Sequence, residues 1–488
     1  MDKFLHFFEN KSILVIGATG FLAKVVIEKI MRVQPEVKKL YLLLRAVDSS
    51  SALHRFNTEV MENELFKVVR EKYGAKLDSI IKEKVSVVCG DITRDCLGLE
   101  TSILEEVFGQ VDIIINSAAT TNFDERYDIA LGINTVGAAN VLSFAKKCRK
   151  LRTLLHVSTA YVCGEKEGLI PETPLKMGEA LNMTPGLNID MEKKIVDDNL
   201  RSLHSAPENH IKSMMRELGL QRARKYGWPN TYTFTKAMGE MMLEQFKENI
   251  HLIIIRPTII TSTFKQPFPG WTEGVRTIDA FIIGFGTGKL TCYPGNPKIT
   301  LDLIPVDMVV NAMMVSIATH VYKTTPMIYH VGSSASNPIS YLRIRDINTR
   351  FFIENPWMSR DGKPVIVTRG TQLPTKLAIQ IYINLNYLIP IKILGVVKAA
   401  SFGYFDRTYI DCSRKVKFLM RMIDLFSPYI FFNIVFDDMN MEKLKSSVNE
   451  MCGDIENEIF NFDPKSINWD DYLIHTHIPG LVKYSSKR

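Results

Sequence analysis

Short apolar runs alternate with amphipathic stretches through the first 160 residues of the chain. The apolar runs have the length and content of buried strands and lie at Ser12–Ile16, Leu40–Leu44, Val85–Cys89, Val111–Ile115 and Thr153–Val157. Between them, apolar residues recur at helical spacing over Phe21–Val33, Ser51–Lys72, Ser102–Phe108 and Ile129–Lys147. Strands that alternate with helices form parallel sheets, because each helix returns the chain to the same end of the sheet. The pattern therefore predicts an α/β fold, a Rossmann-type parallel sheet with helices on both faces.

The alternation resumes after a polar insertion at Gly164–Lys225, which we expect to cap the substrate side of the sheet. The later predicted elements are a helix from about Asn230, strands at Leu252–Ile255, Leu301–Val306 and Ile328–Val331, and a helix at Asp307–Ala318. Proline and polar residues mark a boundary at Asn355–Pro374, beyond which the chain becomes mostly α-helical. Two domains are therefore expected, at residues 1–365 and 372–488.

Composition narrows the class of protein. Hydrophobic residues make up 46% of the chain and charged residues 23%, close to the globular average, so the chain is expected to fold. The net charge of +7 accompanies no aromatic–basic platform or recognition-helix motif, so no nucleic-acid partner is expected, whereas a phosphate-rich substrate or an anionic membrane would attract it. The seven cysteines include no C-x-x-C pair, which favours a reducing compartment and predicts no metal site. About ten residues precede the first strand, so no signal peptide is expected.

A glycine-rich turn follows the first predicted strand directly and opens the first helix. In Gly17-Ala18-Thr19-Gly20-Phe21-Leu22-Ala23, Gly17 permits the sharp turn and Gly20 lets the backbone approach a phosphate. Ala23, where the strictest pattern has a glycine, is small enough for the helix to pack on the sheet. The motif predicts a dinucleotide site at the helix start, an ordinary tight turn being the alternative. Its expected cofactor contacts are Gly17, Thr19, Gly20, Phe21 and Leu22.

Loops at the carboxyl ends of three further strands complete the predicted cofactor site. The second strand ends at Arg45, where enzymes that prefer NAD usually carry an acid, and a cation suits the 2′-phosphate of NADPH. NADPH is therefore the expected cofactor, and the alternative interpretation of Arg45 is an ordinary surface arginine. Gly90-Asp91-Ile92 follows the third strand, and Asn116-Ser117-Ala118-Ala119 follows the fourth. The cofactor contacts expected from these two loops are Asp91, Ile92, Ser117, Ala118 and Ala119.

A tyrosine and a lysine lie four residues apart in Tyr232-Thr233-Phe234-Thr235-Lys236, on one face of a helix. An ammonium near the phenol lowers the phenol's pKa and can hold the nicotinamide ribose, which leaves Tyr232 able to protonate a developing alkoxide. A hydroxyl at Ser158 or Thr159, after the fifth strand, would supply a second donor to that oxygen. The alternative is a surface helix pair, which the position between the fifth and sixth strands disfavours.

Taken together, these elements resemble the extended short-chain dehydrogenase/reductase superfamily and, more closely, the plant-type alcohol-forming fatty acyl-CoA reductases. The resemblance covers nearly the whole chain and rests on the glycine turn, Val157–Gly164, Tyr232–Lys236, Arg256-Pro257-Thr258 and Pro267-Phe268-Pro269-Gly270-Trp271. In the C-terminal region it rests on Phe436-Asp437-Asp438, Phe462-Asp463, Ile467-Asn468-Trp469, Tyr472 and His477-Ile478-Pro479-Gly480-Leu481.

The resemblance implies roles for individual residues. By register with the superfamily's strand-five motif, the catalytic hydroxyl is Thr159, and Cys163 occupies a position that is often tyrosine. The implied catalytic residues are Thr159, Tyr232 and Lys236. The further implied cofactor contacts are Asn134, Ser158, Tyr232, Lys236, Pro257, Thr258 and Ile259.

The resemblance also implies an activity, the NADPH-dependent reduction of a long-chain fatty acyl-CoA to a primary alcohol through an aldehyde, for wax and surface-lipid synthesis. Residues 1–365 are then an NAD(P)-binding extended reductase domain with substrate-side insertions, and residues 372–488 are the family's C-terminal domain. An aldehyde-forming thioester reductase would use the same residues and stays open as an alternative. A sugar-nucleotide epimerase is disfavoured by the C-terminal region, and a catalytically silent binding protein by the intact catalytic set.

Two apolar segments are candidates for contact with lipid. The stretch Leu377–Phe405 is interrupted by polar residues and does not have the pattern of a spanning helix, which leaves an interfacial segment or a buried core helix. The resemblance favours peripheral association with the cytosolic face of the endoplasmic reticulum membrane, a soluble cytoplasmic protein being the alternative. The second segment is Phe264–Leu290. Its apolar residues are expected either to line an acyl tunnel or to belong to the ordinary core; they are Phe268, Trp271, Phe281, Ile282, Ile283 and Phe285.

Overall fold

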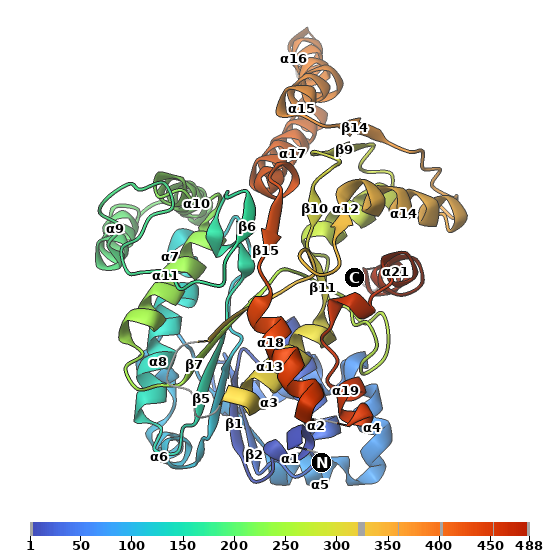
Figure 1. Cartoon of the computed structure of the whole chain (residues 1–488). Helices are drawn as coiled ribbons and strands as arrows, with labels where there is room; N and C mark the ends of the chain where they lie inside the picture. The colour runs from blue at the N-terminus through green and yellow to red at the C-terminus, as the bar shows by residue number, and fades with distance from the viewer. Residues whose placement is uncertain (1–2, 321–326, 360, 401–403, 452, 486–488) are drawn as a thin grey trace.

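A seven-stranded parallel sheet lies at the centre of the computed structural model, which describes residues 3–320, 327–359, 361–400, 404–451 and 453–485 (Figure 1). Its strands lie in the order β12-β7-β5-β4-β1-β2-β3. They are β1 (Ser12–Ile16), β2 (Lys39–Leu44), β3 (Val85–Cys89), β4 (Ile113–Asn116), β5 (Thr153–Val157), β7 (Leu252–Pro257) and β12 (Met327–Val331). The chain order reverses between β1 and β4, so the carboxyl ends of these strands flank the crevice where such sheets bind ligands. The predicted Rossmann-type sheet is confirmed.

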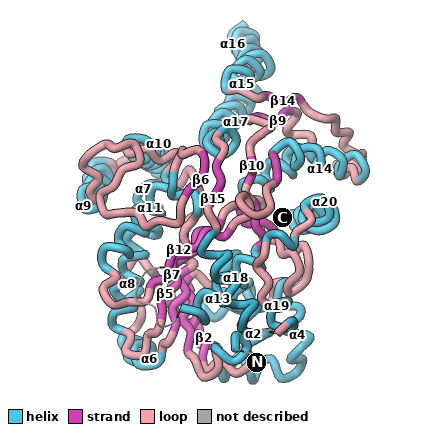
Figure 2. The backbone as a smooth tube through the Cα atoms, viewed as in Figure 1, coloured by secondary structure: helices cyan, strands magenta, loops and turns pink. Residues whose placement is uncertain are grey.

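Helices cover both faces of the sheet, because alternate residues of each strand enter different cores (Figure 2). Ile13 and Val15 pack with α2 and α13 on one face, and Leu14 and Ile16 pack with α6 and α8 on the other. The helices next to the sheet are α2 (Phe21–Val33), α6 (Thr101–Gln110), α8 (Gly137–Lys147), α11 (Thr231–Phe246) and α13 (Val306–His320). The other elements before residue 360 include α1 (Lys3–Phe7), α5 (Leu77–Lys84), α7 (Tyr127–Ala130), η5 (Leu131–Val136), β8 (Ile259–Thr261), α12 (Thr277–Gly286), β9 (Cys292–Pro294), β13 (Ile339–Ser340) and α14 (Tyr341–Glu354).

Two of the predicted elements are wrong in detail. The single helix expected at Ser51–Lys72 is divided into α3 (Ser49–Arg55), η1 (Phe56–Met61), η2 (Glu64–Phe66) and α4 (Lys67–Tyr73). It breaks at Asn63, whose side chain accepts a hydrogen bond from the Leu65 amide (3.0 Å) and so caps a new turn. The strand expected at Leu301–Val306 is divided into β10 (Thr300–Leu301) and β11 (Leu303–Pro305). It breaks at Asp302, a buried carboxylate that accepts a hydrogen bond from the Ser333 amide (2.7 Å).

The polar insertion is largely helical. It contains β6 (Gly168–Ile170), α9 (Ile189–Ser202) and α10 (Glu208–Lys225). The buried carboxylate of Glu192 in α9 accepts hydrogen bonds from Tyr127 (2.7 Å) and from Arg222 of α10 (2.9 Å), which ties the two helices to the main body. Because α10 packs against α11, the insertion covers the helix that carries Tyr232 (Figure 1).

The C-terminal region is mostly helical, as predicted, with two short strands. Its elements are β14 (Thr371–Leu373), α15 (Lys376–Ile383), η7 (Asn384–Leu388), α16 (Ile389–Ala400), α17 (Asp406–Phe431), β15 (Ile434–Phe436), α18 (Met439–Met451), α19 (Asp454–Ile459), η8 (Pro464–Ser466), α20 (Trp469–Asp471), η9 (Tyr472–His477) and α21 (Ile478–Ser485). The strand β15 pairs with β6 of the insertion, and β14 pairs with β9. Met441, Phe460 and Trp469 belong to the same hydrophobic cluster as α2 and α13, so the C-terminal region completes the core on that face of the sheet.

A buried ion pair joins α11 to the sheet. Arg256 at the end of β7 donates to both carboxylate oxygens of Glu240 in α11, with a shortest distance of 2.6 Å. The side chains are 3% and 1% exposed. A third donor of Arg256 bonds to the Thr173 carbonyl in the insertion (3.0 Å). Since both charges are out of water, neither tolerates the loss of its partner.

Replacing Glu240 by alanine should lower the free energy of unfolding by about 3–5 kcal/mol, because it leaves the Arg256 cation buried without its counter-ion. Urea denaturation followed by circular dichroism measures this change. The matched control is Glu105→Ala, which removes an exposed pair with Arg149 (3.4 Å; 63% and 72% exposed) and should cost less than about 1 kcal/mol. Equal losses in the two variants would contradict this account of the Arg256–Glu240 pair.

Candidate active site

The turn after β1 has the shape of a pyrophosphate cradle. Gly17 has φ +83°, and a Cβ there would lie 2.8 Å from the Cα of Ala118 in the loop after β4. Only glycine accommodates both the conformation and the contact. The Gly20 amide donates to the Gly17 carbonyl (2.8 Å), and Gly20 directly precedes α2. Because Gly20 has no side chain to cap the helix, the first amides of α2 can bind an anion, with Thr19, Phe21 and Leu22 in the same turn.

The loop after β4 lies against this turn and carries three predicted cofactor contacts, Ser117, Ala118 and Ala119. Its backbone is fixed by two hydrogen bonds. The Ser117 amide donates to the Ile16 carbonyl (3.1 Å), and the Asn116 side chain accepts from the Ala118 amide (3.3 Å). The loop therefore presents its backbone to the crevice in a set conformation.

Asn134 of η5 holds the same loop from the other side. Its side-chain oxygen accepts from the Thr120 amide (3.1 Å), and its nitrogen donates to the Thr235 hydroxyl of α11 (3.0 Å). Both ends of the buried amide thus bond to protein groups. Asn134 joins the loop to the helix of Tyr232, and its direct contact with the cofactor stays a prediction.

The third strand contributes an ordered turn at the same edge of the sheet. The Asp91 carboxylate accepts hydrogen bonds from the amide and the hydroxyl of Thr93, both at 2.9 Å. Ile92 is buried, and its side chain lies so close to Gly137 of α8 that a Cβ there would come within 2.7 Å. The turn is therefore rigid where the two predicted contacts, Asp91 and Ile92, lie.

Two arginines meet at the end of β2. Arg45 is exposed, and its carbonyl accepts a hydrogen bond from Arg55 of α3 (2.5 Å). Arg55 is held by two hydrogen bonds to Glu59 (2.6 and 2.9 Å). The sequence analysis missed Arg55, because the helix predicted around it gave no sign of folding back onto the strand end. Its place after a strand that ends in arginine is the only local signal.

Tyr232 and Thr159 come together at the carboxyl end of β5. Burial raises the pKa of Tyr232 to about 12, and a hydrogen bond with the Thr159 side chain acts in the opposite direction. The phenol is therefore protonated at neutral pH and able to donate a proton. The Ser158 hydroxyl beside them is buried and has no hydrogen-bond partner among the residues that the structure describes. A buried, unpaired hydroxyl at the same edge of the sheet as the glycine turn fits a bound dinucleotide.

Lys236 lies one helical turn after Tyr232 and is anchored to β5. Its ammonium donates to the Val157 carbonyl (2.6 Å) and lies 3.3 Å from Nε2 of His156. Burial lowers the pKa of Lys236 to about 8, with the charge of Glu240 acting in the opposite direction. Burial, and then the charge of Lys236, lower the pKa of His156 well below its usual value, so this ring is neutral. The lowered phenol pKa expected from the sequence is not seen, because burial has the larger effect on Tyr232.

A buried carboxylate orders the segment after β7, which holds the predicted contacts Pro257, Thr258 and Ile259. The Thr258 hydroxyl donates to the Asp302 carboxylate (2.8 Å), and the Ile259 amide donates to the Asp302 carbonyl (3.1 Å). Burial raises the pKa of Asp302, against the hydrogen bonds that it accepts. The segment is thus fixed beside the crevice, and its contact with a cofactor stays a prediction.

The residues expected to line an acyl tunnel have different environments. Trp271, Ile282 and Phe285 are at most 3% exposed and belong to the core, and Trp271 stacks on Phe21 of the glycine turn (5.2 Å between ring centroids). Phe281 is only half-buried and faces the C-terminal helix α17. Core is therefore the better description for three of the residues, and Phe281 keeps surface for a ligand.

Phe123 is a site residue that the sequence analysis missed. It lies in the loop after β4, and its ring stacks on that of Tyr232, with centroids 5.6 Å apart and planes 16° apart. No periodicity or motif marks this position in the sequence. Its place beside Tyr232 depends on how α11 packs against the loop.

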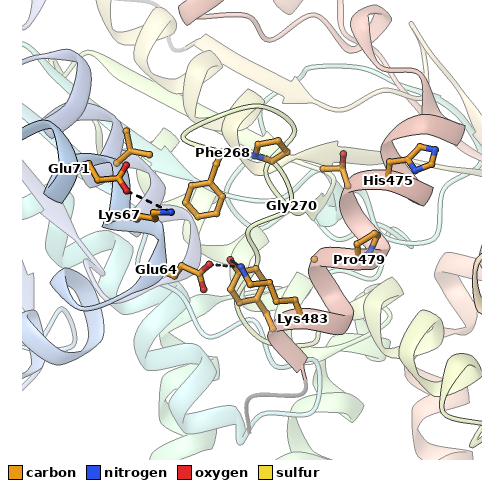
Figure 3. Close-up of a pocket in the computed structure, with 13 residues that line it drawn as sticks. Glu64, Lys67, Glu71, Phe268, Gly270, His475, Pro479 and Lys483 are labelled. Atoms are coloured by element: carbon orange, nitrogen blue, oxygen red, sulfur yellow. Dashed lines mark hydrogen bonds and ion pairs between the residues drawn. The ribbon is translucent and has the colours of Figure 1, made fainter. Parts of the chain in front are cut away.

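A pocket of about 540 Å³ lies between α4, α21 and the loop at Phe268 and Gly270 (Figure 3). Its charged side chains pair with one another, Lys67 with Glu71 (3.7 Å) and Lys483 with Glu64. Among the described residues that line it, none is a predicted catalytic or cofactor residue. The pocket is therefore charge-balanced and separate from the candidate active site.

The glycine turn on a parallel sheet, with a protonated tyrosine at the neighbouring strand ends, defines an NAD(P)-binding oxidoreductase. Solved structures of similar fold are reductase domains. The reductase (R) domain of a non-ribosomal peptide synthetase from Mycobacterium tuberculosis is 15% identical, with a TM-score of 0.57 over 100% of this chain and 95% of that chain. The terminal R domain from the myxalamid biosynthetic pathway is 17% identical, with a TM-score of 0.53 over 94% and 90% of the two chains.

Two sequence families described as male sterility protein match the chain, one over residues 15–313 and one over residues 388–488. An alcohol-forming fatty acyl-CoA reductase from Simmondsia chinensis is 49% identical over 489 residues, 99% of each chain. Fatty acyl-CoA reductase 1 from Arabidopsis thaliana is 48% identical over 487 residues, again 99% of each chain. Fatty acyl-CoA reductase 2 from Homo sapiens is 28% identical over 100% of this chain and 87% of the relative. The chain therefore belongs to the fatty acyl-CoA reductase family.

Proposed function

We propose that this protein reduces long-chain fatty acyl-CoA with NADPH to a primary fatty alcohol, through a fatty aldehyde, in the synthesis of waxes and surface lipids. The observation that carries the proposal is the half-buried Tyr232 hydrogen-bonded to the buried Thr159 at the carboxyl end of β5, in a chain with full-length likeness to an alcohol-forming reductase. The catalytic residues proposed are Thr159, Tyr232 and Lys236.

The proposed reaction uses the same two donors in both reductions. A nicotinamide cofactor, when bound, would supply the hydride that the carbonyl carbon accepts, so that the carbonyl oxygen gains negative charge. In the first reduction Tyr232 and Thr159 donate hydrogen bonds to this oxygen; its double bond to carbon then re-forms as the C–S bond breaks, and CoA leaves as the thiolate. In the second reduction the same two donors bind the aldehyde oxygen, and Tyr232 gives its proton to the alkoxide. Lys236, anchored by the Val157 carbonyl, places its positive charge one turn below the phenol.

Tyr232→Phe should depress reduction of acyl-CoA and of free fatty aldehyde together, by on the order of 10²-fold or more, because both steps lose the same acid. Steady-state rates with each substrate measure this, and NADPH binding by fluorescence should be retained. The wild-type protein should consume two NADPH per acyl-CoA and release a fatty alcohol. Free aldehyde accumulating at one NADPH per thioester would exclude the alcohol-forming activity, and a fully active Tyr232→Phe variant would exclude the proposed acid.

The preference for NADPH is proposed from Arg45 and Arg55. Arg45 directly follows the second strand, and the Arg55 guanidinium bonds to its carbonyl, at the place where a dinucleotide fold meets the adenosine ribose. Arginine binds phosphate through several parallel hydrogen bonds, so a pair of arginines suits a 2′-phosphate. The Glu59 carboxylate is bound by Arg55, so it is not available to pair with Arg45.

Arg45→Asp should lower kcat/KM for NADPH far more than for NADH, because the new carboxylate repels the 2′-phosphate and can accept from a ribose hydroxyl. Initial rates with the two cofactors at a fixed acyl-CoA concentration give the ratio. Arg149→Asp makes the same charge change at an exposed position and serves as the control. An unchanged NADPH/NADH ratio in Arg45→Asp would disprove the assignment.

Peripheral membrane association is proposed from the segment α15–η7–α16. By length and composition alone, two helices could cross a membrane, Tyr127–Lys147 and Lys376–Ala400. In the first helix 56% of the apolar window is buried inside the protein, and in the second only 11%. The alternative that Lys376–Ala400 is a buried core helix is therefore wrong. Residues 401–403, within the predicted apolar stretch, lie outside the described residues.

The exposed side of that segment is apolar and its surroundings are basic. Leu377, Leu385 and Val396 are 60–70% exposed, which is costly in water. From residue 376 to residue 417 the chain carries seven lysines and arginines and two aspartates. An apolar row with a basic surround fits the interface of an anionic bilayer. We propose that it rests on the cytosolic face of the endoplasmic reticulum membrane.

The double variant Leu385→Glu/Val396→Glu should lose membrane binding by about tenfold or more, because charges replace two exposed apolar side chains that the bilayer would bury. Flotation with phosphatidylcholine vesicles, with and without phosphatidylserine, measures the bound fraction. Leu53→Glu/Leu169→Glu replaces two exposed leucines elsewhere and should bind like the wild type. Wild-type protein that stays wholly with the soluble fraction would exclude the proposal.

A further inference from the structure

A continuous aromatic surface leads away from the catalytic tyrosine. The ring of Phe123 stacks on Tyr232 and also contacts Phe426 and Tyr429 of α17, each at 5.4 Å between centroids. Phe426 in turn meets Phe281 of α12 edge-on at 5.6 Å. Rings from four distant parts of the chain thus form one surface that begins at the phenol. We call Phe123, Phe281 and Phe426 the aromatic wall.

Polar contacts hold the aromatic wall in place. The Tyr429 hydroxyl accepts a hydrogen bond from the side chain of Asn230, the residue that caps α11 (2.9 Å). Arg421 of α17 donates two hydrogen bonds to Asp124, the neighbour of Phe123 in the chain (2.6 and 3.1 Å). These contacts fix α17 against both the catalytic helix and the loop after β4. The wall is therefore a preformed part of the site.

The aromatic wall has a buried part, Phe426, and an exposed part, formed by Phe123 and Phe281. Phe426 is 8% exposed, whereas Phe123 and Phe281 are half-buried and keep apolar surface that faces solvent. An acyl chain whose carbonyl oxygen lies at the Tyr232 hydroxyl begins within reach of Phe123. Each methylene that leaves water for such a surface strengthens binding about fourfold. An acyl chain that lies along the wall therefore binds more tightly than one that stays in water.

Helix α17 connects the wall to the apolar segment proposed to meet the membrane. It carries Phe426 near its C-terminal end, and its other end follows α16 in the chain. Figure 1 shows α17 running from the body of the molecule towards α15 and α16, which project from it. The direction of the wall is therefore the direction from which a lipid substrate would come.

We propose that the aromatic wall binds the acyl chain and that Phe281 sets the preference for chain length. The inference rests on the proposed acyl-CoA activity and adds a specificity residue to it. The methylenes next to the carbonyl lie on Phe123, and those further along lie on Phe281, whose ring packs against Phe426 of α17. The distal end of the chain points along α17.

The test is the ratio of kcat/KM for octadecanoyl-CoA to that for octanoyl-CoA. Phe281→Ala should lower this ratio about tenfold or more, because a long chain loses contacts for several methylenes that a short chain does not place there. Phe431→Ala is the matched control. Phe431 is also a half-buried phenylalanine, but it packs with Leu373 and Ile379, away from the wall, so the ratio should not change.

The outcomes separate this inference from the activity on which it rests. Equal losses for both chain lengths in Phe281→Ala, or the same shift in Phe431→Ala, overturn the chain-length role while acyl-CoA reduction stands. A wild-type protein that reduces neither substrate overturns the activity itself.

A second measurement uses the wild-type protein and does not depend on the folding of any variant. Hexadecanoyl-CoA with a diazirine in the middle of its chain is photolysed on the protein in the presence of NADPH, and labelled peptides are identified by mass spectrometry. Label within residues 117–126, 277–286 or 420–431 is expected. Label confined to other peptides overturns the proposal.

Discussion

The close approach of α11 to η5 is the constraint on which the active site depends. A Cβ at Gly239 would lie 2.3 Å from the carbonyl oxygen of Asn134, so any other residue here would push the helix outward. At this distance Glu240 reaches Arg256 of β7, and Lys236 reaches the carbonyl of Val157 on β5. The position of the Tyr232 phenol above the strand ends is therefore set by backbone packing and by the anchored neighbours on its helix, which frees its hydroxyl for a substrate.

The C-terminal region takes part in this arrangement, although the proposed catalytic residues Thr159, Tyr232 and Lys236 all precede it in the chain. The Tyr472 hydroxyl donates to the carbonyl of Ser262 (2.8 Å), and Nε2 of His477 lies 3.2 Å from the carboxylate of Asp279 in α12. These contacts hold the chain on either side of Trp271, whose ring stacks on Phe21 of the glycine turn. The motifs that mark the tail in the sequence thus order a loop that supports the cofactor cradle. A protein lacking this tail would need another means of fixing that loop.

The strands were predictable where a short apolar run is bounded by polar or turn residues. The strands Ser12–Ile16 and Thr153–Val157, inside the sheet, and Val85–Cys89, at its edge, were predicted with the bounds that the structure has. The predictions failed where one polar side chain interrupts a run. Asn63 divides a predicted helix and Asp302 divides a predicted strand, each by bonding to backbone amides in its own turn or in a distant segment.

The candidate site, too, was predictable from the sequence only in part. The sequence by itself determined the glycine turn and the face shared by Tyr232 and Lys236, because a turn conformation and a helical repeat depend on residues next to one another in the chain. Only the tertiary structure decided that Arg55 joins Arg45, that Phe123 lies on Tyr232, and that α17 extends the apolar surface from there. Such contacts join residues far apart in sequence. They arise from the packing of whole helices and strands. That packing depends on many residues far apart in the chain, so it leaves no local sequence pattern.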